Sequence, residues 1–121
     1  MFQLKRATAW SFPVVSLPAT LEGRARPTGV APVVQIRPSR RCNLSCAHCY
    51  SSSSSTEHGE LRLDLLLAYL DDAVKLGYRQ LAVSGGEPLL YSSLAELLAG
   101  AHELGMLTSI TSNGMLATPR R

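Results

Sequence analysis

Residues 31–50, "APVVQIRPSRRCNLSCAHCY", decide how we expect this chain to fold. The stretch begins with a β-branched run, "APVVQI", whose early proline suits a buried strand in which the first residue need not donate to the sheet. A polar loop follows, and it holds every cysteine of the chain, Cys42, Cys46 and Cys49. The sequence therefore predicts a strand that leads directly into a thiol-rich loop.

Helix and strand signals alternate through the rest of the chain. In order, the patterns predict a helix over residues 63–78, a strand over "QLAV" (80–83), a helix from Ser93 to Leu104 and a strand over "LTSIT" (107–111). Gly77 lies where a helix C-terminal cap is favoured, and Ser93 with Glu96 matches a capping box. Strands separated by helices favour parallel neighbours, so we expect an α/β fold with about three parallel strands and two crossover helices.

Polar loops directly follow all three predicted strands. The cysteines follow the first strand, Gly85-Gly86-Glu87-Pro88 follow the second, and Ser112-Asn113-Gly114 follow the third. Loops after parallel strands converge on one rim, where ligands bind. We therefore expect the three loops to face one site.

Length and charge exclude some classes of protein. The chain has 121 residues, of which 45% are hydrophobic, so it can build the core of one domain. Its net charge of +3 comes without the long basic stripe of a nucleic-acid binder, and no nucleic-acid partner is expected. The basic cluster of Arg37, Arg40 and Arg41 suits an anionic ligand or a negatively charged metal centre, with ordinary solvation as the alternative.

The placement of cysteines and apolar residues bears on the cell compartment. An odd cysteine count at tight spacing argues against a disulfide framework and favours a reducing compartment, so we expect a cytoplasmic protein. No apolar run approaches the roughly 18 residues of a membrane span. The stretch "ATAWSFPVVSLPA" loosely resembles a secretory signal, but Pro13 interrupts it. Residues 1–30 are expected to be an irregular lead-in to an organised domain over residues 31–121.

The spacing C-x3-C-x2-C can wrap three thiolates around a soft-metal centre. Iron–sulfur clusters are held by cysteine thiolates, and three ligands leave one iron of a [4Fe-4S] cluster open for another molecule. Zinc is the alternative, because His48 or His58 would complete four ligands and make a structural zinc module. Both occupants stay open at this point.

The segment after the second predicted strand is suited to close approach. Gly85 and Gly86 have no side chain and let backbone groups approach a ligand, while Glu87 places one carboxylate nearby and Pro88 fixes the exit of the chain. An ordinary strand-to-helix turn is the alternative. The dipeptide Asn113-Gly114 by itself is typical of a turn.

"CNLSCAHCY" followed by "SGGEP" resembles the radical S-adenosylmethionine (SAM) enzymes. The hallmark of that superfamily is C-x3-C-x2-C followed by a Gly-Gly-Glu-Pro-like segment, in this order and each after a strand. The wording "CNLxCxHCY" further resembles the branch that includes peptide-modifying maturases and haem-modifying enzymes.

The resemblance implies a site and a reaction. Cys42, Cys46 and Cys49 would bind a [4Fe-4S] cluster whose open iron chelates SAM. Gly85 to Pro88 would help to hold the SAM amino group, His48 would lie near the adenine, and Ser112 and Asn113 would approach SAM. An electron from a donor such as a flavodoxin or ferredoxin would split SAM into methionine and a 5'-deoxyadenosyl radical, which abstracts hydrogen from a substrate, a peptide or a tetrapyrrole by analogy with that branch.

The superfamily usually builds a partial (β/α)6 TIM-like barrel, and the resemblance covers only its first half, over residues 31 to about 117. The expectation is therefore a truncated radical SAM core, or the first half of a longer enzyme. An inactive truncated remnant is the remaining alternative.

Overall fold

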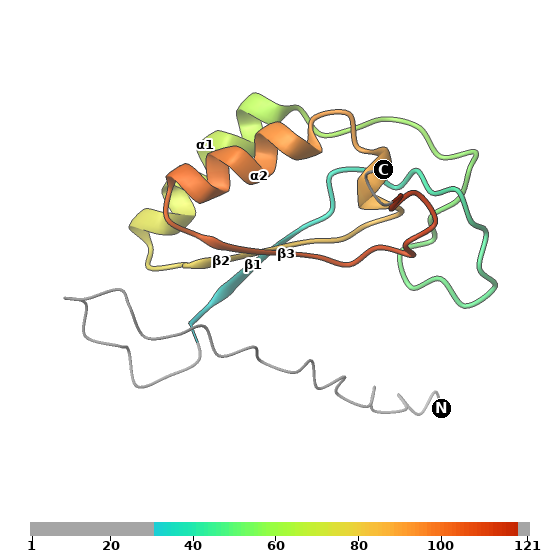
Figure 1. The fold of residues 1–121 in the computed structure, drawn as a ribbon, viewed down its shortest axis with the longest axis horizontal. Coiled ribbons are helices and arrows are strands. Elements are labelled where there is room, and N and C mark those ends of the chain that lie inside the picture. The colour runs from blue at the N-terminus through green and yellow to red at the C-terminus, as the bar shows by residue number, and fades with distance from the viewer. Residues whose placement is uncertain (1–30, 119–121) are drawn as a thin grey trace, which may run out of the picture.

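The computed structural model describes residues 31–118 as one open parallel sheet with two helices on one face (Figure 1). The elements in order are β1 (Val33–Ile36), α1 (Leu63–Lys75), β2 (Gln80–Val83), a short 3-10 helix η1 (Pro88–Leu90), α2 (Leu94–Glu103) and β3 (Leu107–Ile110). The strand order is β1-β2-β3, and both pairs are parallel. The predicted α/β fold is confirmed. The predicted lead-in over residues 1–30 and the signal-like stretch within it lie outside the described residues.

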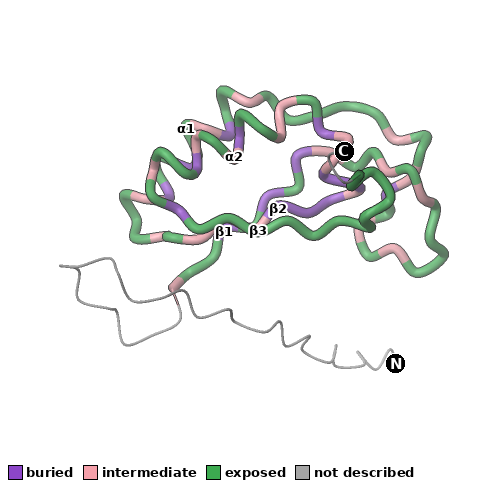
Figure 2. The backbone as a smooth tube through the Cα atoms, in the orientation of Figure 1, coloured by how far each residue is buried: buried purple, intermediate pink, exposed green. Residues whose placement is uncertain are grey.

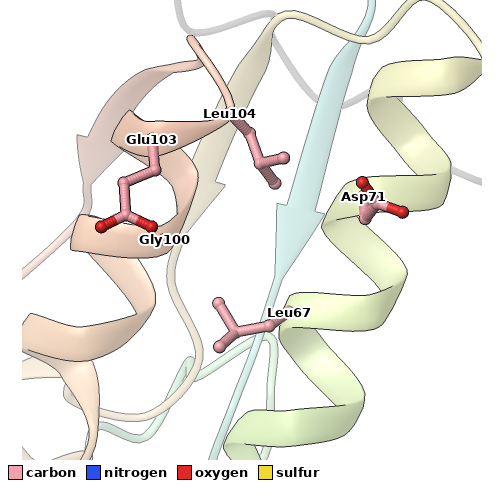
Figure 3. Close-up of a pocket in the computed structure, with 5 residues that line it drawn as sticks. All are labelled: Leu67, Asp71, Gly100, Glu103 and Leu104. Atoms are coloured by element: carbon pink, nitrogen blue, oxygen red, sulfur yellow. The ribbon is translucent and has the colours of Figure 1, made fainter.

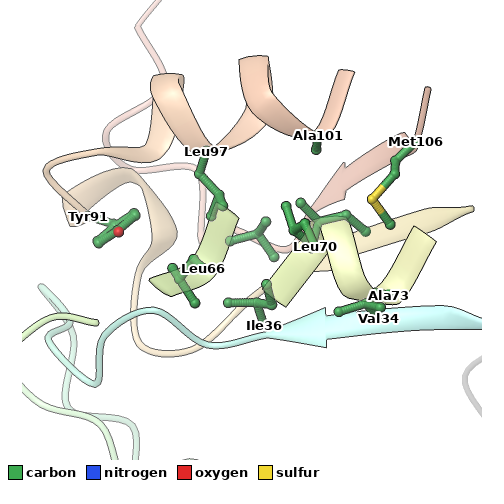
Figure 4. Close-up of a cluster of buried hydrophobic side chains, with 11 residues drawn as sticks. Val34, Ile36, Leu66, Leu70, Ala73, Tyr91, Leu97, Ala101 and Met106 are labelled. Atoms are coloured by element: carbon green, nitrogen blue, oxygen red, sulfur yellow. The ribbon is translucent and has the colours of Figure 1, made fainter. Parts of the chain in front are cut away.

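The core lies between the sheet and the two helices. Val34 and Ile36 alternate with exposed neighbours on β1, and they are in register with the buried Leu81 and Val83 of β2. Leu70 of α1 and other apolar side chains of both helices complete the cluster (Figure 4). In the backbone trace, buried stretches of the helices and of the strands are coloured purple (Figure 2). The buried residues of α1, among them Leu66, Leu70 and Ala73, thus recur at the spacing of a helix that buries one face against a sheet.

Both helices end in the same glycine turn. Gly77 has a positive φ of 96°; its N–H donates to the Val74 carbonyl, and the next N–H, of Tyr78, donates to the Ala73 carbonyl. Gly105, with φ of 74°, ends α2 with the same pair of bonds. This is the Schellman arrangement, which a residue without Cβ adopts most easily. It lets the chain leave each helix and enter the next strand within a few residues.

The capping box predicted for α2 is wrong in its hydrogen bond. Ser93 does occupy the N-cap position, but its side chain makes no capping bond. The chain enters α2 through a tight turn instead, in which the Leu94 N–H donates to the Tyr91 carbonyl at 3.3 Å. That turn follows η1 directly, so Ser93 has a ψ of 29° and lacks the extended backbone that a capping side chain needs.

One pocket of about 240 Å³ lies on the helical side, between α1 and α2 (Figure 3). Leu67, Asp71, Gly100, Glu103 and Leu104 line it. None of the residues predicted to bind a metal or a cofactor is among them. Within residues 31–118, neither helix combines the length and apolar character that crossing a membrane requires.

Candidate functional site

Three loops meet at the C-terminal ends of the strands, as predicted. We call residues 37–62 after β1 the cysteine loop, residues 84–88 after β2 the glycine loop, and residues 111–114 after β3 the Ser-Asn-Gly loop. Hydrogen bonds join the glycine loop to each of the other two, and one side-chain bond joins the cysteine loop to the Ser-Asn-Gly loop. The parallel sheet therefore brings together segments far apart in the sequence.

The two glycines allow the glycine loop to pack against the backbone of the cysteine loop. The Gly86 N–H donates to the Ser39 carbonyl at 3.1 Å, and the Glu87 N–H donates to the Arg41 carbonyl at 2.9 Å. A Cβ on Gly85 would lie 2.6 Å from the Ser39 carbonyl oxygen, and one on Gly86 would collide with the Arg41 carbonyl. Side chains at these positions would push the two loops apart, just before the first cysteine.

Glu87 is the buried polar centre of the site. Its side chain is 2% exposed, and its carboxylate accepts hydrogen bonds from the Ser112 hydroxyl at 2.8 Å and from the N–H groups of Asn113 and Leu89 at 2.9 and 3.0 Å. A buried carboxylate is costly unless such donors surround it. Ser112 and Asn113, two of the residues that the resemblance assigned to SAM, thus contact Glu87.

Asn113 also reaches the cysteine loop. Its side-chain amide donates to the Asn43 side-chain oxygen at 2.8 Å, and its own oxygen accepts from the Met115 N–H at 3.0 Å. Asn43 lies next to Cys42 in the sequence. The Ser-Asn-Gly loop therefore contacts both the carboxylate of the glycine loop and the segment that carries the first cysteine.

All three cysteines are free thiols in the one loop. Among residues 31–118, Cys49 is the cysteine whose sulfur makes hydrogen bonds: the sulfur lies 3.3 Å from the Ser51 hydroxyl and accepts the Ser53 N–H at 3.4 Å. These bonds, with the Ser51 side chain contributing most, lower the pKa of the Cys49 thiol to about 7. Within residues 31–118 the side chains do not gather three Cys, His, Asp or Glu residues into a metal-binding group.

His48 and Tyr50 flank the third cysteine and both are exposed. Tyr50, 68% exposed, has the Arg37 guanidinium over its ring, with the guanidinium carbon 4.7 Å from the ring centre. This cation–π contact joins the end of β1 to the residue after Cys49. His48 and the alternative zinc ligand His58 both extend to the surface of the cysteine loop.

Sequence reasoning missed the serine tract that follows the cysteines. A run of serines by itself suggests only a flexible loop, yet Ser53 is 5% exposed and Ser51 contacts Cys49, Ser53 and the Gly85 carbonyl. Glu60 was also missed, and its carboxylate accepts the N–H and the hydroxyl of Ser92. The available signal was position: a serine two residues after a cysteine can reach its sulfur.

The donor set fits an iron–sulfur cluster in its chemistry. Thiolates are the ligands such clusters require, all three thiols are unpaired, and Cys49 already accepts hydrogen bonds that favour its thiolate. The glycine loop, which resembles the SAM-binding segment, lies against the same loop. The residues present are therefore consistent with a cluster beside a second cofactor.

The fold and the site define an α/β domain that carries its candidate chemistry on strand-end loops, with three thiols after the first strand. This chain belongs to the Radical SAM superfamily, whose family model matches residues 36–121. Among curated proteins it is 42% identical over 86 residues to an Fe-coproporphyrin III synthase of Methanosarcina barkeri, covering 70% of this chain and 22% of that protein. It is 39% identical over 84 residues to a PqqA peptide cyclase of Ruegeria pomeroyi, covering 67% and 22%.

Solved structures give the same fold. The crystal structure of Streptococcus suis SuiB bound to S-adenosylmethionine superimposes with a TM-score of 0.63 at 27% identity, over 73% of this chain and 20% of SuiB. SuiB bound to its precursor peptide SuiA gives a TM-score of 0.64. The chain spans about a fifth of the length of the proteins it matches.

Proposed function

We propose that this chain carries the first half of a radical SAM enzyme core, which binds a [4Fe-4S] cluster and SAM at its strand-end loops. The observation that carries the proposal is the pair of main-chain hydrogen bonds from Gly86 and Glu87 to the Ser39 and Arg41 carbonyls. They fix the Gly-Gly-Glu-Pro segment directly beside the segment that enters the three cysteines. Two sequence motifs are thereby adjacent in space, which an unrelated pair of turns would not require.

In this proposal Cys42, Cys46 and Cys49 hold the cluster. Support comes from their free thiols, their single loop and the soft-ligand character of thiolate. When bound, the reduced cluster supplies the electron that splits SAM into methionine and a 5'-deoxyadenosyl radical for hydrogen abstraction. The protein's own contribution is to position the two cofactors and exclude water.

The SAM side of the proposed site uses the glycine loop. Backbone groups of Gly85 and Gly86 would bind the SAM amino group, and Pro88 fixes the exit of the loop into η1. Glu87 acts mainly by tying Ser112 and Asn113 to the glycine loop, so that all three remain near the cofactor. His48, exposed beside Cys49, would lie near the adenine.

The broader assignment follows from the same proposal. Residues 31–121 form the radical SAM core segment and residues 1–30 lead into it. The three free cysteines favour a reducing cytoplasm, where a flavodoxin or ferredoxin would supply the electron. The relatives are a coproporphyrin synthase and a peptide cyclase, and SuiB binds a precursor peptide, so we propose a tetrapyrrole or a peptide as the substrate class.

Anaerobic reconstitution with iron and sulfide tests the proposal. We expect about four iron and four sulfide per chain, since that is the content of one such cluster. On reduction with dithionite in the presence of SAM, 5'-deoxyadenosine should form, as measured by liquid chromatography. Cys42→Ala should lose the cluster and the product together, because one of its three ligands is gone.

Ser45→Ala is the matched control, because Ser45 is exposed in the same loop. It should bind iron and form product as the unchanged chain does. Stoichiometric zinc with no colour and no SAM cleavage would show a structural zinc module instead. A chain that binds neither metal would be the inactive remnant, and either result would overturn the proposed function.

A further inference from the structure

Ser51 is the residue through which the third cysteine contacts the glycine loop. Its hydroxyl oxygen lies 3.3 Å from the Cys49 sulfur, 2.7 Å from the Ser53 hydroxyl and 3.2 Å from the Gly85 carbonyl oxygen. One side chain thus contacts a proposed cluster ligand and a backbone group of the proposed SAM site. No other serine of residues 51–55 contacts both among the described residues.

The Ser51 hydroxyl can make all three of these contacts as hydrogen bonds. A hydroxyl has one hydrogen to donate and two lone pairs that accept. The Gly85 carbonyl can only accept, so Ser51 donates its hydrogen there. While Cys49 keeps its hydrogen, the Cys49 thiol and the Ser53 hydroxyl donate to the two lone pairs of Ser51, and every group in the network is satisfied.

Metal binding changes the number of hydrogens that these side chains can donate. Cysteine binds a metal as a thiolate, which has no hydrogen left to donate and can only accept. The single Ser51 hydrogen then has two competing acceptors, the anionic Cys49 sulfur and the neutral Gly85 carbonyl. A hydrogen bond to a charged acceptor is roughly twice as strong as one between neutral groups, so the sulfur is preferred.

We propose that Ser51 is a positioning residue that turns its hydroxyl hydrogen from the Gly85 carbonyl to the Cys49 sulfur when a cluster binds, and so stabilises the reduced cluster. The inference rests on the proposed function, since it assigns a role to Ser51 at the same site.

A hydrogen bond to a ligand sulfur tunes the cluster, since such bonds are among the factors that set its reduction potential. The donor stabilises the more negative, reduced state. Removing the hydroxyl should therefore make one-electron reduction about tenfold less favourable, a shift of about 59 mV to more negative potential. A role in loop structure alone would leave the potential unchanged.

The test is a redox titration of the reconstituted 121-residue chain, followed by electron paramagnetic resonance. Ser51→Ala should show the more negative potential, whereas Ser51→Thr keeps the hydroxyl and should titrate like the unchanged chain. Ser55→Ala is the matched control, because Ser55 is an exposed serine of the same tract. If Ser51→Ala does not fold, Ser51→Val against Ser51→Thr repeats the comparison at constant shape.

Calorimetric SAM binding completes the test. Because the Gly85 carbonyl is free in the cluster-bound chain with or without Ser51, Ser51→Ala should keep its SAM Kd within about threefold. An unchanged potential, or a SAM Kd raised by more than about threefold, would overturn the inference and leave the proposed function intact. Failure of the unchanged chain to bind a cluster would defeat the proposed function itself.

Discussion

Glu87→Ala should be among the most destabilising substitutions at the strand ends. The change removes a carboxylate that is 2% exposed and accepts from the Ser112 hydroxyl and from the N–H groups of Asn113 and Leu89. At about 1 kcal/mol for each lost hydrogen bond, the free energy of unfolding should fall by about 3 kcal/mol. That is a large part of the stability of a small domain.

Glu87→Gln should cost less, about 1.5 kcal/mol. The two carboxylate oxygens serve donors on both sides, whereas an amide has one oxygen, so in either orientation an amide N–H group meets a backbone N–H group. Urea unfolding of the metal-free chain at pH 7, followed by circular dichroism, measures both variants. Glu103→Gln, an exposed change on α2, should stay within about 0.5 kcal/mol of the unchanged chain.

The decisive result is whether Glu87→Ala lowers the free energy of unfolding more than Glu87→Gln does. If Glu87→Ala and Glu87→Gln lower the free energy of unfolding equally, or both by less than about 0.5 kcal/mol, the carboxylate does not hold the loops together. A double-mutant cycle with Ser112→Ala isolates one contact, because removing the hydroxyl should matter only when the carboxylate is present.

Three further predictions follow from the loops. Gly86→Ala should lower the melting temperature more than Gly59→Ala. A Cβ on Gly86 collides with a backbone carbonyl, whereas a Cβ on Gly59 has open space around it and only the positive φ of that residue is unfavourable. In the metal-free chain the Cys49 thiol, with a pKa of about 7, is about half thiolate at pH 7, and Ser51→Ala should raise that pKa. Alkylation of Cys49 by iodoacetamide at pH 7 should then slow severalfold and recover at higher pH, as followed by peptide mass mapping; an unchanged rate would contradict the hydrogen bond. Tyr91→Phe removes a hydrogen bond to a cysteine-loop carbonyl and should lower the free energy of unfolding by about 1 kcal/mol in urea. An unchanged free energy of unfolding would show that this bond does not stabilise the fold.

The order of elements was predictable because it rests on local periodicity. Apolar spacing marked α1 and the β-branched runs marked β1, and Gly77 marked the end of α1 through its backbone conformation alone. The absence of the predicted capping bond at Ser93 could not be foreseen, because a tight turn after η1 sets the backbone conformation there. Local sequence patterns therefore predict the helices and strands, whereas the turn before α2 determines whether Ser93 can cap that helix.

The meeting of the three loops could also be predicted, because parallel strands impose it. What each side chain contacts could not. Glu87 was expected beside a ligand, yet its oxygens accept from donors on a loop more than 20 residues away in sequence, and no local pattern encodes that. The serine tract is low in complexity, so only its tertiary contacts show that Ser51, rather than another serine, lies between Cys49 and Gly85.

The hydrogen bonds at Glu87 have a consequence for cofactor binding. They fix the glycine loop against the Ser-Asn-Gly loop, and the bonds to the Ser39 and Arg41 carbonyls fix it against the cysteine loop. A binding site whose backbone is already ordered loses less conformational freedom when its ligand arrives. Variants of Glu87 that loosen these loops should therefore weaken SAM binding by requiring that order to be restored, even where the carboxylate makes no contact with SAM.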